Sequence, residues 1–162
     1  MEQKLELRDV AGYFPYELKF YFKEEPHFTE IVGCSDDGFI YKERDYFWIP
    51  NISNDIAKPI LRPLSGLYRT IVHNGEEIIP IVELAKIYID RDWIFYKSFC
   101  LSGFYEFGYD DGFFVYFKNE PKHLDNQYQL FDYLHELKID YRRLIDEGLA
   151  IDCNTLENNP YK

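Results

Sequence analysis

Short runs of alternating apolar and polar residues dominate the first fifty positions. Turn residues separate these runs, which cover 18–25, 28–35, 39–44 and 46–50. Alternation with a period of two between turn signals is typical of antiparallel strands that bury one face. The pattern therefore predicts an antiparallel meander of four strands, which a curled sheet or small barrel would close so as to limit its exposed edges.

The segment NDIAKPILRPLSGL (54–67) has an unusual arrangement, because Pro59 and Pro63 interrupt an apolar run directly after Lys58 and Arg62. Proline lacks a backbone donor and biases the preceding residue toward extended conformations, which argues against one long helix. We predict a short helical turn and a stiff crossover whose apolar residues pack under the sheet. The alternative is that Lys58 and Arg62 form a small basic site that binds a phosphate or carboxylate.

Three further elements are predicted between the proline segment and residue 118. Asn74-Gly75 lies between β-rich flanks and predicts a hairpin, since both residues tolerate positive φ in a type I′ turn. Residues 82–89 are consistent with a short helix. The stretch 93–118 is dense in Phe and Tyr and cut by glycines, which predicts two or three strands with a tight turn over 109–112.

The segment 126–148 has apolar residues at spacings of three and four, which is the pattern of an amphipathic helix. Asn126 and Gln129 suit its N-terminal cap, and Gly148 suits the position after its end. We expect the apolar stripe to cover one face of the sheet. Residues 149–156 would then return as a short strand or an extended tail.

Together these elements predict an α+β fold: an N-terminal antiparallel meander or small barrel, the Asn74-Gly75 hairpin, further aromatic-rich strands and one long C-terminal amphipathic helix. A single domain over 1–162 is expected from the chain length. Its three parts are 1–67, 68–125 and 126–162.

The charge balance is acidic, with 29 Asp and Glu against 18 Lys and Arg and a net charge of −11. Such a surface repels polyphosphate, so direct binding of nucleic acid is disfavoured. The charge is compatible with solubility alone, or with a basic partner whose nucleic-acid site the protein occupies as a mimic. The three cysteines are far apart in sequence, and no segment is apolar enough to cross a bilayer, so we expect a cytoplasmic protein without a membrane partner.

No residue pattern in the sequence indicates a particular catalytic activity. No two of the four histidines lie at the spacing that places two metal ligands on one helix face. A nucleophile elbow and a glycine-rich phosphate loop are also missing from the sequence. The acid pairs fall in turns, where carboxylates are usually solvated. We therefore predict no catalytic residue, metal or cofactor, and enzymatic activity is unsupported rather than excluded.

Four segments carry a resemblance to a known group of proteins. They are LRDVAGYFPYELK (7–19), KPILRPLSGL (58–67), NGEEIIPI (74–81) and GLAIDCNTL (148–156). In this order they resemble an uncharacterised family of small proteins found in phages, prophages and other mobile elements of gut-type bacteria. The family has no established activity, so the resemblance implies no site residue. The resemblance implies that the protein is carried by a mobile element, where small acidic proteins often act as accessories that manipulate a host or rival factor. Residues 89–125 lie outside the resemblance.

The first functional hypothesis is a protein-binding accessory that modulates a host or defence protein, in the manner of an inhibitor. Its candidate contact patch is the aromatic and acidic set Tyr105, Glu106, Tyr109, Asp110 and Asp111. Aromatic residues are enriched at the centres of protein interfaces, which favours this stretch. The competing interpretation of the same stretch is a sheet core with aromatics on both faces.

The second hypothesis is a small-ligand or enzymatic domain with its site between the meander and the C-terminal helix. Such a site would need convergent polar groups, for which Arg62, His73 and His135 are the candidates. A nucleic-acid mimic and a structural component of a virion are further alternatives. The sequence does not set the oligomeric state.

Overall fold

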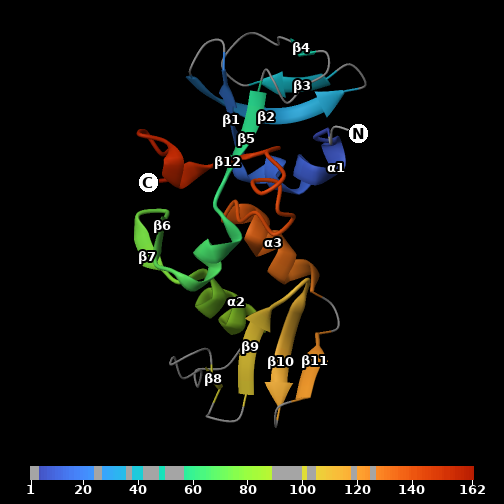
Figure 1. Cartoon of the computed structure of the whole chain (residues 1–162), viewed down its shortest axis with the longest axis vertical. Coiled ribbons are helices and arrows are strands. Elements are labelled where there is room, and N and C mark those ends of the chain that lie inside the picture. The colour runs from blue at the N-terminus through green and yellow to red at the C-terminus, as the bar shows by residue number, and fades with distance from the viewer. Residues whose placement is uncertain are drawn as a thin grey trace. The chain divides into compact units, whose positions relative to one another are not determined.

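A computed structural model describes most of the chain, and Figure 1 shows the arrangement of its elements. The described residues are 4–23, 27–35, 38–41, 48–49, 57–88, 100–101, 105–117, 120–124 and 127–162. The chain divides into two compact units. Unit 1 comprises Met1–Leu64 and Lys138–Lys162, and unit 2 comprises Ser65–Leu137. The expectation that the chain forms a single domain stays a prediction.

Unit 1 is built on a sheet of six strands in the order β12-β5-β1-β2-β3-β4. The strands are β1 (Lys19–Phe22), β2 (His27–Ser35), β3 (Gly38–Tyr41), β4 (Trp48–Ile49), β5 (Ala57–Leu61) and β12 (Ile151–Asp152). The strands β1 to β4 pair antiparallel in chain order, which confirms the predicted meander. In the described strands β4 and β12 are the two ends of the order, so these strands form an open sheet, which is the meander rather than its alternative, the small barrel.

Residues 57–61 of the proline segment form the strand β5, where we predicted a stiff crossover. β5 pairs antiparallel with β1, and β12 pairs parallel with β5 through Ile60 and Leu61. Pro59 lies beyond the end of the β12 pairing, so its missing donor is compatible with a position inside the sheet. Ile60 and Leu61 are buried as expected for this apolar run. A 3-10 helix follows at Leu64–Tyr68, while the helical turn expected before residue 57 lies outside the described residues.

Two basic residues of this segment hold the C-terminal part of unit 1. Lys58 Nζ donates to the carbonyl of Gly148, and the guanidinium of Arg62 donates to the carbonyl of Tyr161 at 2.9 Å. Both contacts join residues about ninety or more positions apart in the chain. These contacts favour the structural interpretation of Lys58 and Arg62 over an anion site.

The predicted long C-terminal helix is wrong beyond residue 136. The helix α3 covers Tyr128–Glu136 and has 9 residues. Lys138 then adopts a left-handed conformation with φ of 57°, and the next residues pair with Arg62 in a parallel bridge at Ile139. The apolar residues of the predicted stripe are therefore divided between the two units. Leu134 is buried in unit 2, and Leu144 is buried in the core of unit 1.

The core of unit 1 includes an N-terminal segment for which the sequence analysis predicted no element. The helix α1 (Leu7–Val10) continues into a 3-10 helix at Ala11–Tyr16. Val10 and Tyr13 are completely buried against residues of β1 and of the C-terminal segment. The hydroxyl of Tyr13 donates to the carbonyl of Ile139 at 2.8 Å, so this buried phenol is satisfied.

Unit 2 combines a hairpin, two helices and a sheet of four strands in the order β11-β10-β9-β8. Its elements are β6 (Ile71–His73), β7 (Glu76–Ile78), α2 (Pro80–Tyr88), β8 (Cys100–Leu101), β9 (Tyr105–Tyr109), β10 (Phe113–Phe117), β11 (Glu120–His123) and α3. Asn74 and Gly75 have φ of 52° and 81°, which confirms the predicted hairpin. The short helix is confirmed as α2, which contacts α3 and β9.

The aromatic stretch forms β8, β9 and β10, as predicted, while β11 was not foreseen. Residues 93–99, which belonged to the same prediction, lie outside the described residues. The ring of Phe114 on β10 lies directly over Gly108, which explains why this position of the stretch is a glycine. A Cβ at Gly108 would come 2.6 Å from that ring. In the part of the chain that the structure describes, no helix is long and apolar enough to cross a membrane.

Candidate functional site

The turn between β9 and β10 carries two of the acidic residues that the sequence analysis selected. Tyr109 and Phe113 face each other as the last pair of the two strands, and Asp110, Asp111 and Gly112 connect them. Asp110 and Asp111 are both exposed. The backbone N–H of Asp110 donates to the carbonyl of Gly112 at 2.9 Å, and Asp111 takes the left-handed conformation with φ of 49°. The tight turn predicted here is therefore present, and it presents its carboxylates at the surface.

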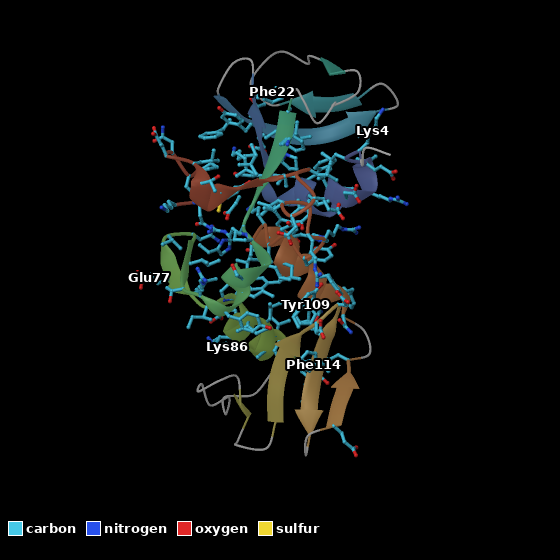
Figure 2. All side chains as sticks on the ribbon, in the orientation of Figure 1. Lys4, Phe22, Glu77, Lys86, Tyr109 and Phe114 are labelled. Atoms are coloured by element: carbon cyan, nitrogen blue, oxygen red, sulfur yellow. The ribbon has the colours of Figure 1, made fainter. Side chains whose placement is uncertain are left out.

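An aromatic cluster supports this turn from inside unit 2. The ring of Tyr109 lies 5.0 Å from Phe113 and 6.3 Å from Phe131 of α3, both in edge-to-face geometry. Phe113 is completely buried and also contacts Phe107 at 5.7 Å. Such aromatic pairs contribute about 0.5–1.5 kcal/mol beyond the area that they bury. Tyr109 therefore anchors the turn, and its half-buried ring is not simply offered to solvent (Figure 2).

Gln127 ties the start of α3 to the first residue of β10. Its Oε1 accepts from the backbone N–H of Phe113 at 2.7 Å. Its Nε2 donates to the carbonyls of Leu124 at 2.8 Å and of Phe113 at 3.3 Å. We predicted Asn126 and Gln129 as caps of this helix and did not identify Gln127, since its partners lie 3 and 14 positions away in the chain. Asn126 itself lies outside the described residues.

We expect Gln127→Ala to loosen the turn. The substitution leaves the N–H of Phe113 and two carbonyls without this partner, and lost hydrogen bonds to partly buried groups cost about 1–3 kcal/mol in the free energy of unfolding. Urea denaturation measures the loss, and hydrogen exchange should show faster exchange of the Phe113 amide. The matched control is Gln129→Ala on the same helix, since Gln129 is exposed and its amide contacts the hydroxyl of Tyr128. Equal stability of the two variants would contradict this role of Gln127.

Tyr68 belongs to the same site although it lies more than 40 residues earlier in the chain. Its hydroxyl lies 3.5 Å from the carbonyl oxygen and 3.4 Å from the amide nitrogen of Tyr109, which is the outer limit of hydrogen bonding. The side chain of Tyr68 is 44% exposed. No local sequence signal connects Tyr68 with the turn, because a 3-10 helix delivers it from another part of unit 2.

Tyr105 and Glu106 lie at the other end of β9 from the turn. A strand rises about 3.3 Å per residue, so roughly 13 Å separates the backbone of Tyr105 from that of Tyr109. The side chains of Tyr105 and Glu106 lie outside the described part of the structure. Of the predicted contact patch, the structure therefore gathers Tyr109, Asp110 and Asp111 at one place and leaves the other two residues apart along the strand.

Among the three polar candidates for a ligand site, Arg62 has its described contacts with the C-terminal residues. It belongs to unit 1, where it is buried, donates to Tyr161 and lies 5.5 Å from the centre of the Tyr161 ring. Burial lowers the pKa of Arg62. His73 and His135 belong to unit 2, where His73 Nε2 lies 3.1 Å from Glu136 Oε1.

Tyr133 shows how burial and negative charge act together in unit 2. Burial raises the pKa of Tyr133 to about 12, and the nearby carboxylates of Glu83 and Glu136 add to this effect. The phenol is therefore neutral at physiological pH. The neighbouring acids disfavour the phenolate, so Tyr133 is held in its neutral form, which can donate a hydrogen bond.

A small pocket of about 240 Å³ lies in unit 1. Its lining residues are Pro63, Leu64, Asp140, Arg143, Ile145 and Asp146. The carboxylate of Asp140 already accepts the backbone N–H groups of Leu144 at 2.9 Å and Ile145 at 2.8 Å. The pocket contains neither Arg62 nor the two histidines. In the described ranges, no group of three or more His, Cys, Asp or Glu residues is placed to hold a metal ion.

Among the described residues, the best-defined candidate site is therefore the exposed acidic turn of unit 2, which an aromatic cluster supports. Comparisons with protein-family models, with curated proteins and with solved structures find no match to this chain.

Proposed function

We propose that the protein is a small acidic accessory protein, of the kind carried by phages and mobile elements, that binds and modulates a host or defence protein. The binding site is the turn between β9 and β10. The observation that carries this proposal is the rigid support of an exposed acidic turn: Asp110 and Asp111 are exposed, while the residues on either side are fixed by aromatic contacts and by Gln127.

Rigid support matters because binding immobilises the groups that make the contact. Ordering a flexible loop or a side chain with many rotamers costs about 0.5–1.5 kcal/mol per side chain, and a turn that is already ordered avoids part of this cost. The hairpin at Asn74-Gly75 provides the contrast, since its acids Glu76 and Glu77 follow a turn flanked by the half-exposed strands β6 and β7. An acid pair that serves only solubility needs no such support. The ordered surroundings of Asp110 and Asp111 therefore favour a role in binding a partner protein.

The surface of unit 2 is also suited to a protein partner. Large apolar side chains that are more than a third exposed in the described part of this unit are Tyr68, Val72, Ile79, Ile87, Tyr88 and Tyr128. Residues 65–137 contain twelve Asp and Glu against six Lys and Arg. Exposed aromatics within an acidic surface provide apolar contact area, and the acids steer a basic partner toward it.

The test is an affinity pull-down of the tagged full chain from lysate of its native host, followed by mass spectrometry at low and at high salt. We compare wild type with Asp110→Asn/Asp111→Asn, which removes two charges while keeping side-chain size. Asparagine tolerates the left-handed conformation at position 111, so the turn should survive. We expect one stoichiometric protein with wild type at both salts and its loss from the double variant.

The matched control is Glu76→Gln/Glu77→Gln, which makes the same change of net charge on another hairpin of unit 2 (Figure 2). It should retain the partner as wild type does. Retention by all three proteins would refute the turn as the site, and no stoichiometric protein with wild type would refute the proposed function. A nucleic-acid-handling protein retained only at low salt would instead support mimicry, since electrostatic contacts weaken steeply with ionic strength.

A further inference from the structure

The hairpin between β6 and β7 turns at Asn74-Gly75, and Asn74 is the only asparagine of the chain that glycine follows. Both residues are exposed, and a Cβ at Gly75 would meet no described atom within 4 Å. We propose that Asn74 is a site of spontaneous modification, at which the side-chain amide is converted to aspartate and isoaspartate through a cyclic imide. This inference concerns a different turn from the proposed binding site and does not depend on it.

The reaction follows from the chemistry of the two residues. The backbone nitrogen of Gly75 attacks Cγ of Asn74 and loses its proton, the Cγ–Nδ2 bond breaks, and ammonia leaves. Water then opens the imide. Cleavage between the imide nitrogen and Cγ gives aspartate, and cleavage between the nitrogen and the backbone carbonyl carbon gives isoaspartate. One water is consumed and one ammonia is released, without oxidation or reduction. Glycine favours the attack because no side chain hinders its nitrogen.

The hairpin supplies the conformation that the attack requires by opening locally. In the closed turn Asn74 and Gly75 have φ of 52° and 81°, and the backbone must rotate to bring Cγ of Asn74 onto the nitrogen of Gly75. In the described sheet order, β6 and β7 have three residues each and pair only with each other. A two-stranded hairpin is marginally stable by itself, and its opening costs less than global unfolding. The folded protein therefore reaches the reactive conformation.

The preceding residue places a proton donor at the leaving group. Nε2 of His73 lies 3.1 Å from Nδ2 of Asn74 and 3.1 Å from Oε1 of Glu136. In the tetrahedral intermediate Nδ2 becomes an amine, which must take up a proton before it leaves as ammonia. A protonated imidazole can supply this proton as a general acid. His73 therefore accelerates the loss of ammonia from Asn74.

The test is incubation of the full chain over several weeks in warm, neutral buffer made with water that carries heavy oxygen. Tryptic digestion in ordinary water and mass spectrometry follow, so that conversion during the digest carries no heavy oxygen. Trypsin releases Asn74 in the peptide 70–86, which contains no other Asn or Gln, and three asparagines that do not precede glycine in 144–162. We expect 70–86 to exchange its amide for a carboxyl group with one solvent oxygen, while 144–162 keeps its mass.

A protease that cleaves before aspartate but not before isoaspartate should then divide the converted peptide into two products, as opening of an imide requires. An unchanged mass of 70–86, or an equal gain of mass by the two peptides, would overturn the inference.

The variant His73→Phe keeps a ring at this position and removes the acid. It should slow the conversion at least about threefold, with both rates corrected for the hairpin opening that hydrogen exchange of the β7 amides measures. Conversion as fast as in wild type after this correction would refute the role of His73.

Discussion

Replacement of Tyr161 by phenylalanine is expected to lower the free energy of unfolding by about 2–4 kcal/mol, and replacement by alanine by about 3–5 kcal/mol or more. The register of β1 and β5 places Phe20 opposite Pro59, so that the next pair is Lys19 and Ile60. The Tyr161 hydroxyl lies between them, where it accepts from the N–H of Lys19 at 3.1 Å and donates to the carbonyl of Ile60 at 2.9 Å. Tyr161 thus replaces a direct rung of the sheet.

Two further observations explain the size of this effect. Both hydrogen bonds of the Tyr161 hydroxyl are partly buried, so the phenylalanine variant would leave the Lys19 N–H and the Ile60 carbonyl poorly solvated, and the same burial raises the pKa of Tyr161. The alanine variant also removes the ring that lies 5.5 Å from the Arg62 guanidinium and 5.6 Å from Lys138 Nζ. The two cations would then lose their shared aromatic contact.

Urea denaturation followed by circular dichroism measures both Tyr161 variants, and hydrogen exchange of the Lys19 amide reports on the lost rung. The matched control is Tyr128→Phe, since Tyr128 is 63% exposed and a surface change of this kind usually alters stability by less than about 0.5 kcal/mol. A Tyr161→Phe variant as stable as Tyr128→Phe would show that the hydroxyl does not hold the sheet.

Replacement of Asp140 by alanine should lower the free energy of unfolding by about 3 kcal/mol, because two backbone donors lose their acceptors. Asp140 is 2% exposed, and its two oxygens accept the N–H groups of Leu144 and Ile145. Burial raises the pKa of the Asp140 carboxyl, and the two donors partly oppose this effect. Asp140→Asn should be less damaging than alanine, since its amide keeps one acceptor oxygen.

Asp146→Ala provides the control for Asp140, since Asp146 lies in the same loop and lines the same pocket but is exposed. Thermal denaturation of both variants gives the comparison. We expect the exposed site to change stability by less than about 0.5 kcal/mol. An equal loss at the two positions would indicate that the loop does not depend on the buried carboxylate.

The residues that fold by local rules were predictable from sequence. The meander follows from alternation with a period of two, and the hairpin follows from the tolerance of Asn74 and Gly75 for positive φ. The turn at Asp110 and Asp111 was predictable for the same reason. In each case the determining residues lie within a few positions of one another.

The predictions that failed concern residues whose conformation depends on partners far away in the sequence. Apolar residues after position 137 have helical spacing, yet the carboxylate of Asp140 competes for backbone donors and Arg62 pairs with the backbone around Ile139. Residues 57–61 of the proline segment form a strand because β1 and β12 pair with them on either side. Tyr68 and Gln127 reach the turn from other elements, so no pattern within 93–118 could identify them.

We propose that the acidic turn of unit 2 contacts a partner protein, and the affinity of the purified partner for three versions of the full chain tests this contact. Calorimetry at low and at high salt would compare wild type, Asp110→Asn/Asp111→Asn and Glu76→Gln/Glu77→Gln. We expect the control to bind as wild type does and the turn variant to bind at least about tenfold more weakly at both salts. Equal affinity of all three proteins would contradict it.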